Sequence, residues 1–219
     1  MKKLALWGAG GLGLQIYELA EWQNSEEPCW EEIFFVDDWK PEGELYGTRN
    51  LHFETVKKQF SPNEIEFIVA LGDPVDKRKR FHEIENAGYD LGRVIAPNAR
   101  VSKSAKLGRS VILQVGSLAE PEVVLGDGVT VEDYAAIGHG TSVGDFCHVC
   151  AKTTIGGGSN IGQGTFIGLH SIFKQGSNIG EYVTVGMGSV VVKDIPDKVV
   201  VVGNPARIIK NRDENTKVF

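Results

Sequence analysis

Several features are scarce in this sequence of 219 residues, and each scarcity excludes a class of protein. It has three cysteines, an odd number too small for a disulfide framework, so a reducing cytoplasm is expected. No apolar run approaches the roughly 20 residues that a membrane span requires, so no membrane association is expected. Basic residues number 23 against 29 acidic ones, and the net charge of −6 argues against nucleic acid as a partner.

Glycine, by contrast, is abundant, and its distribution divides the chain. Of the 27 glycines, nine lie in residues 1–92 and eighteen in residues 93–219. All four tryptophans lie in the first segment, which carries a net charge of −8 (10 Lys and Arg against 18 Asp and Glu). The second segment carries +2 (13 against 11). This change in composition predicts a domain boundary near Gly92.

Residues 95–195 repeat every six positions. From Ile95 to Val191, all seventeen residues in steps of six are apolar. Four positions after each of them, sixteen of seventeen residues are Ala, Val, Ser, Thr or Cys. A period of six fits neither a helix nor a two-faced strand, and it predicts short strands joined by corners, three to a rung of about 18 residues. We therefore expect a parallel β-helix of triangular section, in which the glycine that often follows the apolar residue gives each corner its backbone freedom.

The first segment contains the pattern of a nucleotide-binding α/β domain. A short apolar strand at residues 4–7 leads into GAGGLG, and residues 12–20 follow with helical spacing. Further strands are expected at residues 33–36 and 67–71, and a helix at 75–87. The glycines let the backbone approach a phosphate at the helix N-terminus, and carboxylates at the end of the second strand can accept from ribose hydroxyls. The predicted nucleotide contacts are Gly8, Gly10, Gly11, Gly13, Asp37, Asp38, Leu71 and Gly72.

Two alternatives bear on this segment. One is a tight turn that begins a helix and binds nothing. The other is a site for a nicotinamide dinucleotide, which normally needs two such halves, whereas 92 residues supply one. An NAD-dependent oxidoreductase is therefore excluded by domain size.

Two histidines, His139 and His148, lie nine residues apart on the predicted coil, in AAIGHGTSVGDFCHVC. Imidazole can take up a proton near neutral pH, although the commoner role of a histidine is structural. Gly157 follows His139 by eighteen residues, so its backbone N–H is expected on the same face, one rung further along the coil. Cys147 fits an inward small position and no second cysteine pair follows Cys150, so no metal site is expected.

The repeat, the histidine segment and the ending VVVGNPARII resemble the hexapeptide-repeat acyltransferases. The uninterrupted units resemble the subgroup that acetylates nucleotide-linked amino sugars and sialic acid. The resemblance implies a left-handed coil, a homotrimer with its site between subunits, acetyl-CoA as cosubstrate and a nucleotide-linked sugar as substrate. It also implies that His139 is the general base. The contacts expected for acetyl-CoA are His148, Gly157, Gly203, Pro205, Ala206 and Arg207.

One position departs from the family pattern. The family usually has Glu or Asp directly after the catalytic histidine, where this chain has Gly140. Glu132, where the family more often shows Asn, is the expected replacement that orients His139. The alternative is that Glu132 is a solvated edge residue and that a main-chain carbonyl or a bound water orients His139.

Together these features predict an enzyme, an acetyl-CoA-dependent N-acetyltransferase that acts on a nucleotide-linked amino sugar. Residues 1–92 form the nucleotide-sugar-binding α/β domain and residues 93–197 the left-handed β-helix. Residues 198–219 form a closing strand and a polar, frayed tail. The alternatives are O-acetylation of a sugar or sialic acid within the same family, and a non-catalytic nucleotide-sugar-binding trimer.

Overall fold

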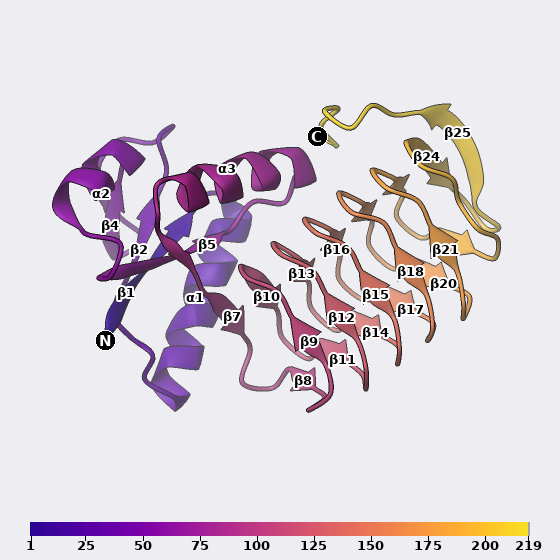
Figure 1. Cartoon of the computed structure of the whole chain (residues 1–219), viewed down its shortest axis with the longest axis horizontal. Coiled ribbons are helices and arrows are strands. Elements are labelled where there is room, and N and C mark those ends of the chain that lie inside the picture. The colour runs from indigo at the N-terminus through magenta and orange to yellow at the C-terminus, as the bar shows by residue number, and fades with distance from the viewer. Residues whose placement is uncertain (219) are drawn as a thin grey trace.

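The computed structural model describes residues 1–218, and it consists of a small α/β unit followed by a triangular coil (Figure 1). The sheet of the α/β unit has the order β3-β4-β2-β1-β5-β6, and its central strands β2, β1 and β5 run parallel. Its elements are β1 (Lys2–Trp7), α1 (Gly11–Glu26), β2 (Trp30–Val36), β3 (Gly43–Leu45), β4 (Thr48–Leu51), α2 (Phe53–Gln59), β5 (Ile65–Val69), α3 (Pro74–Asn86) and β6 (Asp90–Leu91).

The central strands are the ones that the sequence predicts, because their apolar side chains are buried on both faces of the sheet. The predicted helix at 75–87 is α3. The strand expected at 67–71 ends at Val69, since Ala70 and Leu71 form a loop packed against Gly8. The hairpin of β3 and β4 and the short α2 were not predicted, because their polar residues lack a clear period of two or 3.6.

The coil has three flat faces, each a mainly parallel sheet that takes one strand from each rung. The first sheet contains β7 (Arg93–Ile95), β10 (Val111–Leu113), β13 (Thr130–Val131), β16 (His148–Val149), β19 (Phe166–Ile167), β22 (Thr184–Val185), β24 (Val199–Val202) and the antiparallel β25 (Arg207–Asn211). The second contains β8 (Arg100–Val101), β11 (Leu118–Ala119), β14 (Ala136–Ile137), β17 (Thr154–Ile155), β20 (Ile172–Phe173) and β23 (Val190–Val191). The third contains β9 (Lys106–Leu107), β12 (Val124–Leu125), β15 (Ser142–Val143), β18 (Asn160–Ile161) and β21 (Asn178–Ile179).

The register of these sheets confirms the predicted β-helix. From β7 to β23, neighbouring strands pair at an offset of 18 residues, as in Ile112 opposite Thr130. The second residue of each two-residue strand points inward, and the apolar series is buried from Leu113 to Val191. The small residues four positions later are buried as well, and hydroxyls such as that of Ser159 donate to corner carbonyls.

The expected role of the repeat glycines was wrong, and the structure gives a different one. The residues with left-handed backbone recur every six positions, but they lie three positions after the apolar residue and include Tyr134 and Glu122 besides glycines. The glycine directly after the apolar residue has no positive φ. A Cβ built on Gly138 would lie 2.5 Å from the Gly157 nitrogen, and one on Gly144 would lie 2.6 Å from the Gln163 nitrogen. These positions are glycine because the next rung lies too close for a side chain.

One continuous apolar cluster joins the α/β unit to the first rungs of the coil. Val94, Ala96 and Ile112 pack with residues of β1, α1 and β5. The sheet of the α/β unit ends with β6 and the coil begins with β7, so we propose to keep the division of the chain at residues 92 and 197. No helix within residues 1–218 is both long enough and apolar enough to cross a membrane.

The tail from Lys210 to Phe219 was expected to be frayed, which was wrong for residues 210–218; Phe219 lies outside the described residues. Arg212 is buried and donates to backbone carbonyls of the tail and of β22's rung. The Val218 N–H donates to Asp73, the N-cap of α3, and Lys217 pairs with Asp76 in the first turn of that helix. The tail therefore fastens the end of the coil to α3, and Figure 1 shows the C-terminus beside that helix.

Candidate active site

The glycine loop of the α/β unit leaves open space at the start of α1. Gly8 has φ +115°, and a Cβ on it would lie 2.8 Å from the Ala70 carbonyl oxygen. A Cβ on Gly13 would collide with the Gly8 carbonyl oxygen, so this glycine lets the helix pack on the loop. A Cβ on Gly10 or Gly11 would meet nothing within 4 Å. The structure thus presents backbone N–H groups and a helix N-terminus to an open region, the arrangement that suits a phosphate.

The acidic pair lies beside this loop, but its two members differ. Asp37 is buried, and its carboxylate accepts from the Ala9 N–H (3.0 Å) and the Trp39 N–H (2.9 Å), so it fixes the loop. Asp38 is exposed, and one oxygen accepts from the Phe53 N–H at the start of α2. Trp39, which sequence reasoning missed, is 88% exposed directly after the pair. A tryptophan directly after the two acidic residues that follow a predicted strand was the available signal in the sequence.

His139 lies on a corner of the coil that continues over the next rungs. Its exposed imidazole packs on Gly157, where a Cβ would lie 2.7 Å from His139 Nε2. The Gly158 N–H donates to the His139 carbonyl (2.7 Å), and the Gly176 N–H donates to the Gly157 carbonyl (3.0 Å). The same corner therefore carries His139, Gly157, Gln175 and, after β23, Lys193. We call these four residues the corner row. The structure brings His139 and Gly157 together as their spacing of eighteen residues predicts.

The Gly157 N–H is a free donor because no acidic side chain of a neighbouring rung accepts from it. At other corners such a side chain does: Glu120 accepts from the His139 N–H (2.9 Å) and Glu132 from the Ala151 N–H (2.9 Å), each nineteen residues later, and Asp133 accepts from the Val115 N–H (3.1 Å), eighteen residues earlier. The residue nineteen before Gly157 is Gly138, which has no side chain. Among residues 1–218 the Gly157 N–H donates no hydrogen bond. Glu120, which sequence reasoning missed, holds the backbone of His139, and the spacing of nineteen was the signal.

The closing segment forms the end of the same corner. A cleft of about 310 Å³ lies between the last rung and β25, and Lys193, Ala206 and Arg207 are among its lining residues. Gly203 and Pro205 lie in the turn that precedes β25 and do not line the cleft. Lys193 and Arg207 supply two exposed positive charges there. Lys193 was missed at the sequence level, although it follows His139 by three rungs of eighteen residues.

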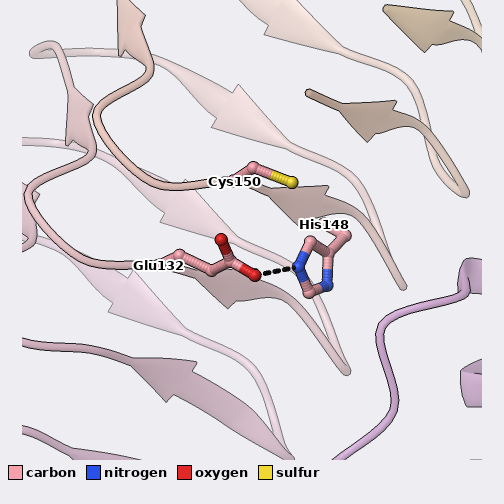
Figure 2. A group of neighbouring side chains, drawn as sticks. All are labelled: Glu132, His148 and Cys150. Carbon is pink, nitrogen blue, oxygen red and sulfur yellow. Dashed lines mark hydrogen bonds and ion pairs between the residues drawn. The ribbon is translucent and has the colours of Figure 1, made fainter. Parts of the chain in front are cut away.

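Glu132 and His148 are placed differently from the expectation (Figure 2). Glu132 Oε1 lies 2.7 Å from His148 Nε2, and its other oxygen accepts from Ala151, so the expected bond from Glu132 to His139 is absent among residues 1–218. His148 is 2% exposed, with its ring stacked on Phe166. The structure also differs from the expected contact of His148 with acetyl-CoA, because the ring is buried beneath α3 of the same chain. Within residues 1–218, Glu132 therefore does not orient the His139 ring.

Lys77 of α3 reaches into this cluster, and burial is the main influence on its protonation. Its side chain is fully buried, and Nζ lies 2.9 Å from Thr130 Oγ1 and 3.5 Å from His148 Nδ1. Burial lowers the pKa of Lys77 to about 8 and also lowers the pKa of His148. Burial pushes the pKa of Glu132 upward, but the hydrogen bonds from His148 and Ala151 outweigh it and hold that pKa below its usual value. The imidazole is therefore neutral, with Nδ1 accepting from Lys77 and Nε2–H donating to Glu132.

Glu132, His148 and Cys150 also form a possible metal-ligand set, with donor atoms within 4.8 Å of one another. A cation on His148 Nε2 would displace the proton shared with Glu132 and turn Nδ1–H toward the Lys77 ammonium. It would also need the Cys150 thiolate, whereas burial raises the pKa of that thiol to about 12. The hydrogen-bonded pair therefore competes with metal binding at this place.

Replacing Lys77 with Met is expected to change how stability depends on pH. The unfolded chain keeps the Lys77 proton up to its usual pKa of 10.5, whereas the folded chain releases it near pH 8. The contribution of Lys77 to the free energy of unfolding therefore rises between these pH values, by about 1.4 kcal/mol per pH unit. Denaturant titrations of the wild type and Lys77→Met at pH 7.5 and 9.5 should show the difference between them change by about 2 kcal/mol in favour of the wild type. Comparing the two proteins at the same pH removes the opposing effect of the buried thiols, which both contain. A difference in the free energy of unfolding that stays the same at both pH values would contradict the assignment of Lys77 as a buried amine.

Comparisons with known proteins agree with this geometry. Residues 3–84 match the family of the PglD N-terminal domain. No curated protein sequence matches the chain. The acetyltransferase domain of PglB from Neisseria gonorrhoeae FA1090 matches with a TM-score of 0.89 and 31% identity, over 95% of this chain and 100% of that one. A variant of perosamine N-acetyltransferase from Caulobacter crescentus, in complex with CoA and GDP-perosamine, matches with a TM-score of 0.88 and 25% identity, over 96% and 98%. WeeI from Acinetobacter baumannii AYE, at 24% identity and a TM-score of 0.87, shows the fold alone, over 95% and 100%.

An α/β unit with a glycine loop, followed by a left-handed parallel β-helix, is the fold shared by these structures. The chain belongs to the hexapeptide-repeat sugar acetyltransferases, the family of the matched PglB domain. It is accordingly an acyltransferase, and the predicted family, fold class and enzyme class are confirmed.

Proposed function

We propose that the chain is an acetyl-CoA-dependent N-acetyltransferase that acts on the amino group of a nucleotide-linked amino sugar. The observation that carries this proposal is the contact between the His139 imidazole and Gly157, whose N–H has no acceptor among residues 1–218. A base beside a free donor is what acyl transfer from a thioester requires. Two similar structures support the substrate classes: a PglB acetyltransferase domain in complex with acetyl coenzyme A, and perosamine N-acetyltransferase in complex with CoA and GDP-perosamine.

In the proposed reaction, the neutral sugar amine attacks the thioester carbonyl carbon. His139 takes the proton that the amine loses as the C–N bond forms. The Gly157 N–H stabilises the negative charge on the carbonyl oxygen, and the tetrahedral intermediate then expels the CoA thiolate, which accepts a proton. Glu120 holds the His139 backbone in place, so the corner stays fixed even though Gly140 supplies no carboxylate.

Acetyl-CoA is proposed to lie along the corner row. Adjacent strands are about 4.8 Å apart, so three rungs separate His139 from Lys193 by about 14 Å. That length suits an extended pantetheine arm between a thioester at His139 and phosphates at Lys193 and Arg207. The predicted contacts Gly157, Ala206 and Arg207 fall on this path, whereas Gly203 and Pro205 shape the turn beside it.

The nucleotide is proposed to bind the α/β unit, with its phosphates at Gly10 and Gly11 and its ribose at Asp38. The exposed indole of Trp39 suits stacking with the base, and Asp37 acts by holding the loop. Leu71 and Gly72 line the loop from the neighbouring strand end. These contacts extend the predicted set by Trp39.

A homotrimer is proposed because the second sheet of the coil presents an uncharged and mainly apolar outer face. The outward residues of the second sheet from β11 to β23 carry no charge, and Ile172 among them is 51% exposed. A second copy seated on this face would bring its own His139 corner near the α/β unit of its neighbour. Sedimentation velocity measures the assembly, and a chain that is fully active as a monomer would contradict this arrangement.

The test of the proposed function is an acetylation assay with the purified chain, acetyl-CoA and UDP-, dTDP- or GDP-linked amino sugars. Mass spectrometry is expected to show the added acetyl group on nitrogen of one of these sugars, with one CoA released per product. Acetylation on oxygen only would favour the O-acetyltransferase alternative. Acetyl-CoA that stays intact with every sugar would favour the non-catalytic one.

Removing the two charges at the end of the corner row is expected to weaken acetyl-CoA binding selectively. Arg207→Ala together with Lys193→Ala should raise the acetyl-CoA KM by about tenfold or more, because each cation contributes about 1 kcal/mol to phosphate binding. The KM for the sugar nucleotide should stay unchanged. Arg100→Ala, at the opposite end of the coil, is the matched control, and an equal rise of both KM values would show that the closing segment acts only through the fold.

A further inference from the structure

A second cleft, of about 280 Å³, lies between α1 and the first rungs of the coil, outside the residues assigned so far. Helix α1 forms one wall and the corners that follow β10 and β13 form the other. Its lining combines an indole ring, two carboxylates and two amides, with no basic side chain: Gln15, Glu18, Leu19, Trp22, Gln114, Val115 and Asp133. Aromatic and aliphatic surface with a few polar groups is typical of a small-molecule site.

One buried polar group in this cleft has no partner. Gln114 is 4% exposed, and its Nε2 makes no hydrogen bond within residues 1–218. Leaving such a donor unsatisfied destabilises the folded chain, so the amide is placed for an acceptor that the chain itself does not supply. The Glu18 carboxylate makes no hydrogen bond or ion pair within the same residues. Asp133 uses one oxygen to accept from the Val115 N–H (3.1 Å) and keeps the other free.

The cleft lies one helical turn from the glycine loop. Gln15 follows Gly11 by four residues, so it occupies the same face of α1, about 6 Å along the axis. Glu18 and Trp22 continue that face toward the coil. A sugar attached to a phosphate at the start of α1 would therefore lie within reach of this cleft.

We propose that the cleft is the hexose subsite of the nucleotide-sugar site, and that it selects a neutral or cationic sugar over an anionic one. This proposal rests on the function proposed above and adds the charge class of the sugar. The Trp22 ring packs on the apolar face of the pyranose, and Gln114 Nε2 donates to a sugar oxygen. Glu18 and Asp133 accept from sugar hydroxyls or an ammonium group, and they repel a sugar carboxylate.

The test uses calorimetric titration of the full chain with a free nucleoside diphosphate and with the same nucleotide linked to an amino hexose. Gln114→Leu is expected to raise the Kd of the nucleotide sugar about tenfold and to leave the Kd of the free nucleotide unchanged. Because the variant removes an unsatisfied donor, its Tm should equal or exceed that of the wild type. Gln59→Leu, on the exposed end of α2, is the control for the substitution itself.

A second variant tests the charge selectivity without altering the packing. The wild type is expected to bind a nucleotide-linked uronic acid at least tenfold more weakly than the same nucleotide linked to a neutral hexose. Glu18→Gln should reduce this ratio of Kd values. Equal changes for free nucleotide and nucleotide sugar in Gln114→Leu, or an unaltered ratio in Glu18→Gln, would overturn the subsite while leaving the proposed function intact. A wild-type chain that binds neither free nucleotides nor nucleotide sugars would overturn both.

Discussion

His139→Ala is expected to lower kcat by roughly 10²–10⁴, the usual contribution of a positioned general base. Proton removal from the attacking amine would then fall to water, whereas the Gly157 donor and both binding regions would remain. The KM values for acetyl-CoA and for the sugar nucleotide should therefore change little, so the loss should appear in kcat. Steady-state kinetics with each substrate varied in turn measures this.

His170→Ala is the matched control for that variant. His170 is also exposed on the coil, but it lies on a different corner, after β19. Its replacement is expected to leave kcat within about twofold of the wild type, since surface changes away from a site are usually neutral. If His139→Ala kept half of the wild-type kcat, His139 would have no part in the chemistry.

Two glycine replacements in the nucleotide loop are expected to separate binding from folding. A Cβ at Gly10 meets nothing within 4 Å, so Gly10→Ala should fold normally and yet occupy the space beside the helix N-terminus. The expected result is a rise in the sugar-nucleotide KM of about tenfold or more, with stability changed by about 1 kcal/mol or less. The KM for acetyl-CoA should not change.

Gly13→Ala should affect both properties. Its Cβ would collide with the Gly8 carbonyl oxygen, a backbone atom that cannot rotate away. The free energy of unfolding should fall by about 2–3 kcal/mol, and the loop should lose its shape together with its nucleotide affinity. Thermal unfolding and KM measurements on the two variants provide the comparison. A Gly10→Ala variant as unstable as Gly13→Ala would mean that this loop serves only the packing of α1.

The sequence determined the coil and the partnership of His139 with Gly157. In a β-helix with rungs of 18 residues, spacing along the chain is also position in space, so residues eighteen apart lie one above the other. The same rule places Lys193 at the end of the corner row. The glycine loop followed from local spacing in the same way, because strand, turn and helix are consecutive.

Only the tertiary structure decided what covers each face of the coil and why its glycines are needed. Lys77 lies on a helix and precedes Thr130, which it contacts, by 53 residues. Beneath this buried lysine, His148 and Glu132 bind each other, so His148 is not available to acetyl-CoA and Glu132 does not orient His139. The glycines after the apolar residues are required because the backbone of the neighbouring rung leaves no room for a Cβ. The local sequence does not show this contact. A six-residue repeat determines which residues of the coil lie next to one another. Contacts between the coil and the α/β unit depend on how their surfaces pack, and the repeat does not determine that packing.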